Sequence, residues 1–355
     1  MVGDVDPPTG RDPGRAARAL PRPTTLPASM VLTVTRACNL RCAYCPTAKD
    51  GWPSLDVDQA RRAVTLFADR YCDAGRPGDV KLFGGEPLLV PDVVRAAIEA
   101  AVARPEIRRV TLSTNGLGLD ADWLELVARN PKLVLTVSMD GRPRDHRRLR
   151  RALPGVADSY DHLHSLLPAL RRTPRVVVTQ TIAPSAARHA AANFHHLLEL
   201  GFSRFNFLPG YFLPWRPDQL ASLREGLSHI ADEVRARWAA GRRLYVRNLF
   251  TWAPTPFFNT GLVVDSDGSI HPSNVGLSGQ LDGLRGRTRV GSLDAPPSVA
   301  RLRQRAAAIN AMLAETLEPR VWESTLAADA ALTGFVRGLV PAWIAARRRR
   351  RRRGS

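Results

Sequence analysis

The stretch "MVLTVTRACNLRCAYC", residues 30–45, joins a short run rich in β-branched residues to a loop that holds three of the chain's four cysteines. Cys38, Cys42 and Cys45 follow the spacing C-x3-C-x2-C directly after this expected strand. In parallel α/β barrels, the loops that leave the carboxyl ends of the strands carry the reactive groups. We therefore expect the three thiols to mark the functional end of the fold.

Strand and helix patterns alternate six times after this point. Stretches of helical period, two of them introduced by Asp56 and Asp120 as N-caps, separate β-branched runs at residues 30–35, 79–85, 108–114, 133–139, 174–182 and 203–209. Repeated strand–helix units build a parallel sheet, and six are fewer than the eight of a closed barrel. The sequence predicts an α/β fold, a partial (β/α)6 parallel barrel with a small C-terminal α+β subdomain.

The predicted barrel spans residues 29–215. Before it, residues 1–28 are rich in Pro, Gly and Arg and are predicted to be disordered. After it, residues 216–345 are predicted to form a long helix and a small subdomain that includes a hairpin around the Asp-Gly of "VVDSDGSIHPSN". Residues 346–355 hold the run Arg347 to Arg353 and are predicted to be a disordered Arg-rich tail.

The formal net charge of +18 invites a nucleic-acid interpretation. The seven-arginine run accounts for part of it, leaving 18 − 7 = +11 without it. Two interpretations of the tail therefore remain: it binds RNA, the ribosome or an anionic membrane, or it is solvated and has no specific role. No apolar stretch is long enough to span a membrane, and four cysteines make no disulfide framework, so we expect a cytoplasmic protein.

Three chemistries suit the cysteine loop. Zinc sites close with a fourth Cys or His at short spacing, which does not follow here. A redox dithiol of Cys42 and Cys45 would leave Cys38 without a purpose. A 4Fe–4S cluster held by three cysteines leaves one iron open, and Arg36 and Arg41 are expected to favour thiolates and an anionic cluster.

The loop resembles the signature of the radical S-adenosylmethionine (radical SAM) enzymes, with Tyr44 just before the last cysteine. The resemblance continues in "FGGEPLL", "LSTNG", "VSMDG" and "LGFSRFNFLP", each at the end of a later strand or along one. It covers residues 30–215 and is closest to the branch that carries SPASM or twitch C-terminal domains. It implies one 4Fe–4S cluster held by Cys38, Cys42 and Cys45, with SAM as the second cofactor.

The resemblance also implies the SAM contacts. Gly84 and Gly85 would let the backbone approach the amino acid end of SAM, and Glu86 would hold its ammonium. Tyr44 would lie against the adenine. Further contacts to the ribose or the substrate are implied for Ser113, Asn115, Ser138 and Asp140. The alternatives from local sequence are simple turns at "GGEP", at Asn115 and at Asp140.

The implied reaction is reductive cleavage of SAM to a 5′-deoxyadenosyl radical, which abstracts hydrogen from a substrate. The implied substrate is a peptide or protein, as in ribosomal peptide maturation, and the implied electron donor is a flavodoxin or ferredoxin. The Arg-rich loop at 141–151 has two interpretations: it steers an acidic peptide, or it is a solvated loop with no specific role. Tyr211, Phe212 and Trp215 also have two: they contact the substrate, or they pack beneath the C-terminal subdomain.

The sequence departs from that branch in its C-terminal part. Ser273 stands where a cysteine is expected, and no cysteine follows Cys72, which is interpreted as a packed thiol. The subdomain is therefore predicted to be a scaffold without auxiliary clusters. A replacement metal site of Asp265, Asp267 and His271 is the weaker alternative to a hairpin turn. The open functional alternatives are a small-molecule or nucleic-acid substrate, a catalytically silent SAM- or peptide-binding scaffold, and a zinc-binding module.

Overall fold

The computed structural model describes residues 29–72, 75–250, 261–277 and 281–353. The predicted disordered segment at residues 1–28 lies outside the described residues.

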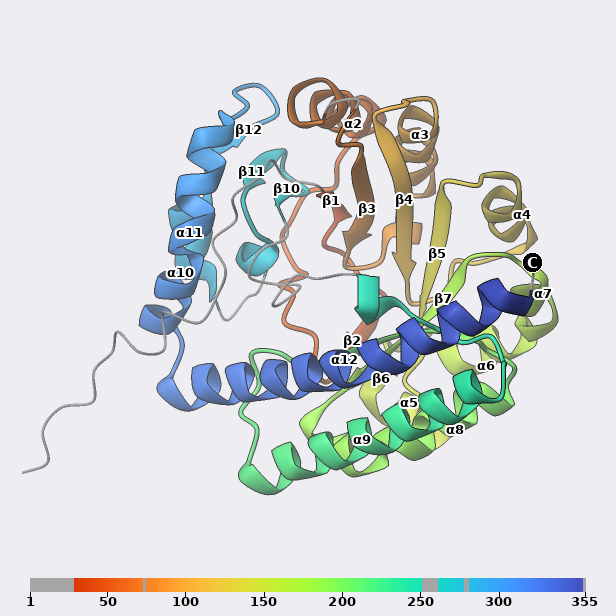
Figure 1. Cartoon of the computed structure of the whole chain (residues 1–355). Helices are drawn as coiled ribbons and strands as arrows, with labels where there is room; N and C mark the ends of the chain where they lie inside the picture. Colours follow the sequence, from red (N-terminus) through yellow and green to blue (C-terminus); the bar gives the residue numbers. More distant parts are fainter. Residues whose placement is uncertain (1–28, 73–74, 251–260, 278–280, 354–355) are drawn as a thin grey trace, which may run out of the picture.

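A ten-stranded sheet organises the fold (Figure 1). Its centre is six parallel strands that lie side by side in the order β1 (Ser29–Thr35), β3 (Gly78–Gly84), β4 (Ile107–Thr114), β5 (Leu133–Ser138), β7 (Val176–Ile182) and β8 (Arg204–Pro209). These are the six strands expected from the sequence, and the partial parallel barrel is confirmed.

Helices surround the outside of this sheet in Figure 1. They are α2 (Val57–Tyr71), α3 (Pro91–Val102), α4 (Ala121–Arg129), α6 (Ser159–Ser165), α7 (Leu167–Arg172) and α8 (Ala190–Glu199). Asp56 caps α2 by accepting from Gln59 N at 2.7 Å, and Asp120 caps α4 by accepting from Trp123 N at 2.9 Å. A carboxylate at this position satisfies a backbone N–H that the helix leaves unpaired, so both predicted helix starts are confirmed.

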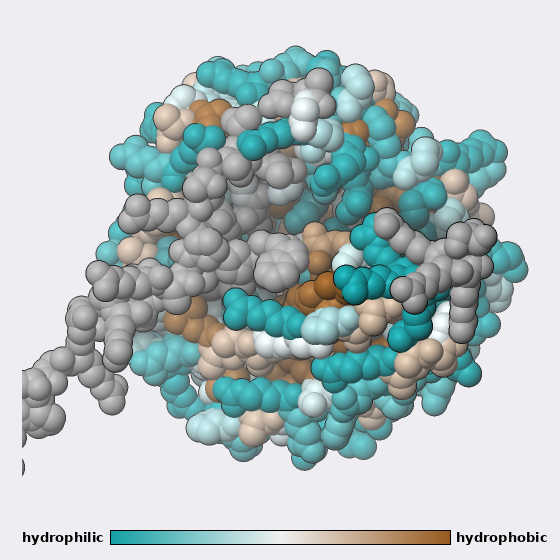
Figure 2. Space-filling view, in the orientation of Figure 1, coloured by the Kyte–Doolittle hydropathy of each residue, from teal (hydrophilic) through white to brown (hydrophobic). Residues whose placement is uncertain are grey.

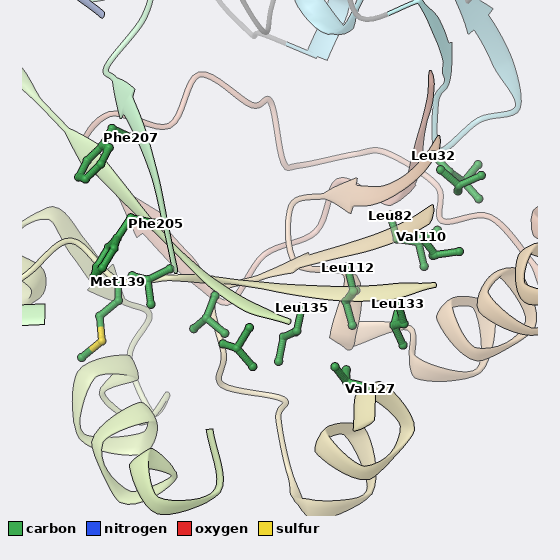
Figure 3. Close-up of a cluster of buried hydrophobic side chains, with 14 of the residues drawn as sticks. Leu32, Leu82, Val110, Leu112, Val127, Leu133, Leu135, Met139, Phe205 and Phe207 are labelled. Atoms are coloured by element: carbon green, nitrogen blue, oxygen red, sulfur yellow. The ribbon is translucent and has the colours of Figure 1, made fainter. Parts of the chain in front are cut away.

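The core lies between the strands and the helices. Leu82, Leu112 and Leu135 are fully buried, and the leucines of β4 and β5 point toward α4, which carries Val127 (Figure 3). Each such leucine contributes about 2 kcal/mol of burial free energy. Because successive side chains of a strand point to opposite faces, the residues between these leucines face the barrel interior. That interior carries polar side chains, among them Thr111 and Thr136.

The C-terminal segment extends the sheet at both of its edges. β9 (Tyr245–Val246) pairs in parallel with β8, and β10 (Leu262–Val264) pairs in parallel with β1. β11 (Ser269–His271) and the short β12 (Gly291–Ser292) then add antiparallel strands. The hairpin predicted at the Asp-Gly turn is confirmed, with Gly268 at a φ of 76° and its N–H donating to Asp265 O at 2.9 Å. The boundary placed at residue 216 stays a prediction, and the pairing of β10 with β1 was not foreseen.

Long helices complete the C-terminal segment. They are α9 (Pro217–Ala239), α11 (Val299–Thr316) and α12 (Pro319–Arg353), with the short α10 (Asp282–Thr288) before α11. α9 and α12 run alongside one another, and hydrophilic residues dominate the face seen in Figure 2. The predicted disordered tail is wrong up to Arg353, because α12 continues through the arginine run as regular helix.

The structure corrects one further expectation and decides between two alternatives for another segment. The Arg-rich segment is no loop: it forms α5 (Pro143–Leu149) and β6 (Arg150–Ala152). Tyr211, Phe212 and Trp215 form no exposed rim, because each is at most 3% exposed and packs beneath α12. Hydrogen bonds to α12 hold them there, so packing explains these aromatic residues.

Among the described residues, no helix combines the length and the apolar character needed to cross a membrane.

Candidate functional site

The cysteine loop lies at the carboxyl end of β1, as expected. Within it, β2 (Leu40–Cys42) pairs antiparallel with β6, so that Cys42 lies opposite Arg150. Further hydrogen bonds run from Ala43 N to Leu149 O at 2.8 Å and from Leu153 N to Asn39 O at 3.2 Å. Backbone hydrogen bonds from β6 and the residues on either side of it thus hold the cysteine loop in place. This pairing could not be predicted from the sequence, because a three-residue strand has too few residues to show a period.

The three cysteines are half-buried and none forms a disulfide. Burial raises the pKa of Cys38, and it raises the pKa of Cys42 to about 12. The neutral thiols are therefore favoured until a metal deprotonates them, since a coordinating thiol is held as thiolate by the ion's charge.

The cations at the thiols differ from those expected. Lys49 Nζ lies 3.2 Å from Cys45 Sγ, whereas Arg41 donates to Cys38 O at 2.9 Å. Arg36 points away into a fully buried ion pair with Asp265, and its guanidinium lies 3.7 Å from the Trp52 ring centroid. The assignment of Arg36 to the cluster is therefore wrong, because a guanidinium already paired in the interior is not available to the thiols.

Three half-buried thiols share the loop, and a 4Fe–4S cluster held by three cysteines needs this donor set. Among the described residues, no group of three or more His, Cys, Asp or Glu side chains is arranged around a single metal-ion position.

Gly84 and Gly85 press the end of β3 against the cysteine loop. Gly85 N donates to Thr35 O and Glu86 N donates to Ala37 O, both at 2.8 Å. A Cβ on Gly84 would come within 2.0 Å of Thr35 O, and one on Gly85 within 2.1 Å of Ala37 O. The glycines are thus required for backbone contact just before Cys38, and a contact of the same glycines with SAM stays a proposal.

Glu86 joins three strand ends and is 1% exposed. Its carboxylate accepts from Thr114 Oγ1 at 2.7 Å, from Asn115 N at 2.7 Å and from Leu88 N at 3.0 Å. Burial raises its pKa and these hydrogen bonds oppose the rise. All three donors are neutral, and no basic side chain in the described part of the chain forms an ion pair with it. A buried carboxylate with neutral donors favours a cation beside it.

Asn115 and Asn39 meet across the mouth of the barrel. Asn115 Nδ2 donates to Asn39 Oδ1 at 2.7 Å, and Asn115 Oδ1 accepts from Leu117 N at 3.0 Å. Ser113 and Ser138 end β4 and β5 on the interior face and are half-buried. The predicted polar strand ends are thus brought together, and Asn39 is an addition that the sequence did not single out.

Asp140 is fully engaged with protein groups. It accepts from Arg150 at 2.9 Å and 3.2 Å, from the Tyr44 hydroxyl at 2.8 Å and from Thr181 N at 3.0 Å. Tyr44 packs against Leu149 and two alanines. Asp140 therefore positions Tyr44 and Arg150 beside Cys42. Arg150 was considered only with the Arg-rich loop and its steering of a peptide, and its buried pair with Asp140 was not foreseen.

The alternative metal site in the hairpin does not form. Asp265 pairs with Arg36, and Asp267 pairs with Arg285. His271 hydrogen-bonds Ser269 at 2.9 Å and Thr288 at 3.1 Å, and burial lowers its pKa to about 4. The fold thus uses all three side chains itself. Cys72 ends α2 and packs against the core, as predicted.

Comparisons with known proteins agree with this geometry. Residues 32–179 match the model of the Radical SAM superfamily. A GTP 3′,8-cyclase of Mannheimia succiniciproducens is 38% identical over 98 residues, which are 26% of this chain and 27% of that protein. The sporulation killing factor maturation protein SkfB of Bacillus subtilis is 28% identical over 162 residues, 46% of this chain and 37% of that protein. The chain thus matches about a third of the length of these curated relatives.

Solved structures share the fold. The enzyme anSMEcpe with bound AdoMet superposes with a TM-score of 0.70 at 16% identity, covering 91% of this chain and 99% of that one. Streptococcus suis SuiB bound to its precursor peptide SuiA gives a TM-score of 0.55 at 15% identity, with 71% and 61% covered.

The family match spans the cysteine loop, the Gly-Gly-Glu segment and the polar ends of β4 and β5. Residues 32–179 of the chain are therefore identified as a radical SAM superfamily domain.

Proposed function

We propose that this chain cleaves SAM reductively at one 4Fe–4S cluster held by Cys38, Cys42 and Cys45. The observation that supports it most is the hydrogen-bonded contact of Gly85 and Glu86 with the loop that carries these thiols. A cluster held by these three cysteines would supply the electron for reductive cleavage of SAM, and the 5′-deoxyadenosyl radical so formed would abstract hydrogen from the substrate.

The chain's own residues bind SAM and the substrate and orient them at the cluster. Glu86 offers a buried negative charge to the ammonium of SAM. Gly84 and Gly85 hold the backbone before Glu86 close to the segment that leads to the cysteines, and so set the distance between Glu86 and the thiols. Ser113, Asn115 and Ser138 offer hydrogen bonds at the strand ends to the ribose or the substrate. Tyr44, held by Asp140, offers a ring face to the adenine. The half-buried loop limits access of water to the site.

Anaerobic reconstitution tests this proposal. The protein should turn brown and, with SAM and a strong reductant, form 5′-deoxyadenosine. A colourless protein that binds zinc would support the zinc module instead. A brown protein that forms no 5′-deoxyadenosine would support the silent scaffold.

Glu86→Gln separates SAM binding from cluster binding. The carboxamide keeps the shape but removes the charge, so SAM affinity should fall by about tenfold or more while iron content stays near that of the wild type. Asp79→Asn, which removes a carboxylate from the other end of β3, is the control. Equal loss of iron and SAM affinity in Glu86→Gln would mean that Glu86 is only structural.

For the substrate, we propose first a peptide or protein, with a flavodoxin or ferredoxin as reductant in the cytoplasm. SkfB supports this by its name, and SuiB by its structure with SuiA. The test is transfer of deuterium from a labelled candidate peptide, encoded beside the gene, into 5′-deoxyadenosine. Deuterium-free product in the presence of the labelled peptide would count against that peptide.

A small anionic molecule is the second candidate. GTP 3′,8-cyclases are relatives of this chain by sequence. The 38% identity to a GTP 3′,8-cyclase over 98 residues is the observation that favours this class.

A further inference from the structure

Lys49 brings a charged side chain to the sulfur of one of the three loop cysteines. Its Nζ donates to Cys45 Sγ at 3.2 Å and to Thr47 O at 3.2 Å, and the side chain is half-buried. Burial raises the pKa of Cys38, and the charge of Lys49 is among the influences that oppose this rise. The lysine therefore acts on two of the three thiols, although it lies outside the motifs that resemble the radical SAM enzymes.

The charge of Lys49 is not neutralised by a carboxylate, unlike that of the other cations beside the thiols. Arg41 pairs with Asp50 at 3.2 Å, and Arg150 makes two hydrogen bonds to Asp140. In the described part of the chain, no carboxylate forms an ion pair with Lys49, whose contacts are a sulfur and a backbone oxygen. An ion pair cancels most of its own field, so the lysine is the stronger source of positive potential at the thiols.

The C-terminal segment fixes the backbone on both sides of Lys49. Ala48 N donates to Leu277 O at 3.0 Å. Two guanidinium groups lie over the ring of Trp52, at 3.7 Å and 4.4 Å from its centroid, and they belong to Arg36 and Arg285. Such contacts combine cation–π attraction with stacking. A backbone held before and after the lysine keeps its side chain within reach of Cys45.

A positive donor at a ligand sulfur has a known effect on an iron–sulfur cluster. Reduction adds one negative charge to the cluster, and hydrogen bonds to its sulfurs are among the factors that set its reduction potential. A charged donor makes a hydrogen bond about twice as strong as a neutral one. Because Lys49 and Cys45 are both half-buried, water screens their interaction less than it would at the surface.

We propose that Lys49 is a positioning residue that raises the reduction potential of the 4Fe–4S cluster through the sulfur of Cys45. This inference rests on the proposed function, because it requires the cluster. One electron passes from a one-electron reductant, which is oxidised, to the cluster, which is reduced, and no bond of the chain forms or breaks. The C-terminal segment thus has a role in the chemistry without binding a cluster itself: it holds Lys49 in place.

An anaerobic redox titration of the cluster-loaded chain, without SAM, tests the inference. The reduced cluster is measured by electron paramagnetic resonance. At a fixed potential, the ratio of reduced to oxidised cluster should fall about tenfold in Lys49→Gln, which is a shift of about 59 mV to more negative potential for a one-electron couple. Lys49→Met removes the donor as well as the charge and should shift the potential at least as far. Lys49→Arg keeps both and should restore most of the wild-type value.

Two variants serve as controls. Arg41→Gln removes a positive charge from the same loop, but this side chain donates to carbonyl oxygens and to Asp50, so the shift should be less than about half that of Lys49→Gln. Arg129→Gln removes a charge from an exposed pair just before β5, at the other end of the strands, and should cause no shift. The iron content of each variant checks that the cluster is bound.

A wild-type potential in both Lys49→Gln and Lys49→Met would overturn the inference. So would an equal shift in Arg41→Gln, because the total charge of the loop and not the contact with sulfur would then set the potential. The two proposals fail separately. A chain that forms 5′-deoxyadenosine but whose potential does not respond to Lys49 overturns this inference alone, and a chain whose potential shifts as expected without forming 5′-deoxyadenosine overturns the proposed SAM cleavage alone.

Discussion

Asp140 is the residue on which the geometry around Cys42 depends. Its carboxylate is inaccessible to solvent and holds Arg150, whose side chain is 6% exposed. Removing one partner of a buried ion pair leaves the other charge uncompensated. Asp140→Asn should therefore lower the free energy of unfolding of the apo chain by about 3 kcal/mol in urea titrations.

A double-mutant cycle shows whether the loss comes from the pair. Asp140→Asn/Arg150→Met should be less destabilised than the sum of its single variants, because no unpaired charge remains. Glu125→Gln, in an exposed pair with Arg129, should cost less than about 1 kcal/mol. Strict additivity of Asp140→Asn and Arg150→Met would contradict the coupling.

At this scale the sequence predicted residue types better than their partners. The cysteines, Glu86 and Asn115 were singled out because they follow strand ends in motifs that resemble those of the radical SAM enzymes, and their roles stay predictions. Asn39 was missed because its contact with Asn115 joins residues far apart in the sequence. Arg150 was considered only for steering a peptide, because no local pattern indicates its pair with Asp140. Arg36 was misassigned because its partner, Asp265, lies 229 residues away.

Among the elements, β6 is expected to control retention of the cluster. Leu153 directly follows β6, and Leu153→Pro removes the N–H that bonds to Asn39 O. The loop should loosen, and bound iron should be lost to a chelator at least about twice as fast. Leu153→Ala keeps the N–H and is the control. Identical rates of iron release from both variants would show that β6 does not restrain the loop.

Helix α12 carries a pH-sensitive group. Burial raises the pKa of Asp329 to about 7, although the Tyr211 hydroxyl donates to it at 3.0 Å. The folded chain therefore binds more protons than the unfolded chain between about pH 4 and 7, so stability falls as pH rises through this window. Asp329→Asn removes the free-energy cost of holding a charged carboxylate at this buried position above pH 7.

The stability advantage of Asp329→Asn over the wild type should widen from pH 4 to pH 8. It should reach about 2 kcal/mol, half the full value of the shift, because the side chain keeps some solvent contact. Glu323→Gln, on an exposed position of the same helix, should show no such trend. An advantage that is constant with pH in urea titrations would contradict the raised pKa.

The sequence predicted long elements well and short ones poorly. The six central strands and α9 have clear periods, whereas β6, β9 and β10 have two or three residues each. The arginine run was predicted to repel itself into disorder, yet it continues a helix whose earlier turns pack against α9. Packing of the first turns outweighs local repulsion, which a reading of composition does not include.

For the molecule as a whole, the number of cysteines predicts its iron content. One set of three ligands holds one cluster, so the reconstituted chain should bind about four irons. Cys38→Ala/Cys42→Ala/Cys45→Ala should bind essentially none, and Cys72→Ser should match the wild type in iron and in SAM cleavage. Residual cluster signals in the triple variant, measured by electron paramagnetic resonance, would mean that ligands other than cysteine exist in the C-terminal part.

The pairing of β10 with β1 also sets the order of events during synthesis. The strand that leads into the cysteine loop lacks a neighbour on one edge, and Arg36 lacks its counter-ion, until the ribosome has added some 229 further residues. At typical elongation rates that interval is roughly 10 to 45 s. During it the nascent chain exposes an open strand edge beside three free thiols, a state open to misassembly and oxidation. Cluster insertion is therefore expected to follow synthesis of β10 and Asp265, and the three thiols of the nascent loop need protection from oxidation until then.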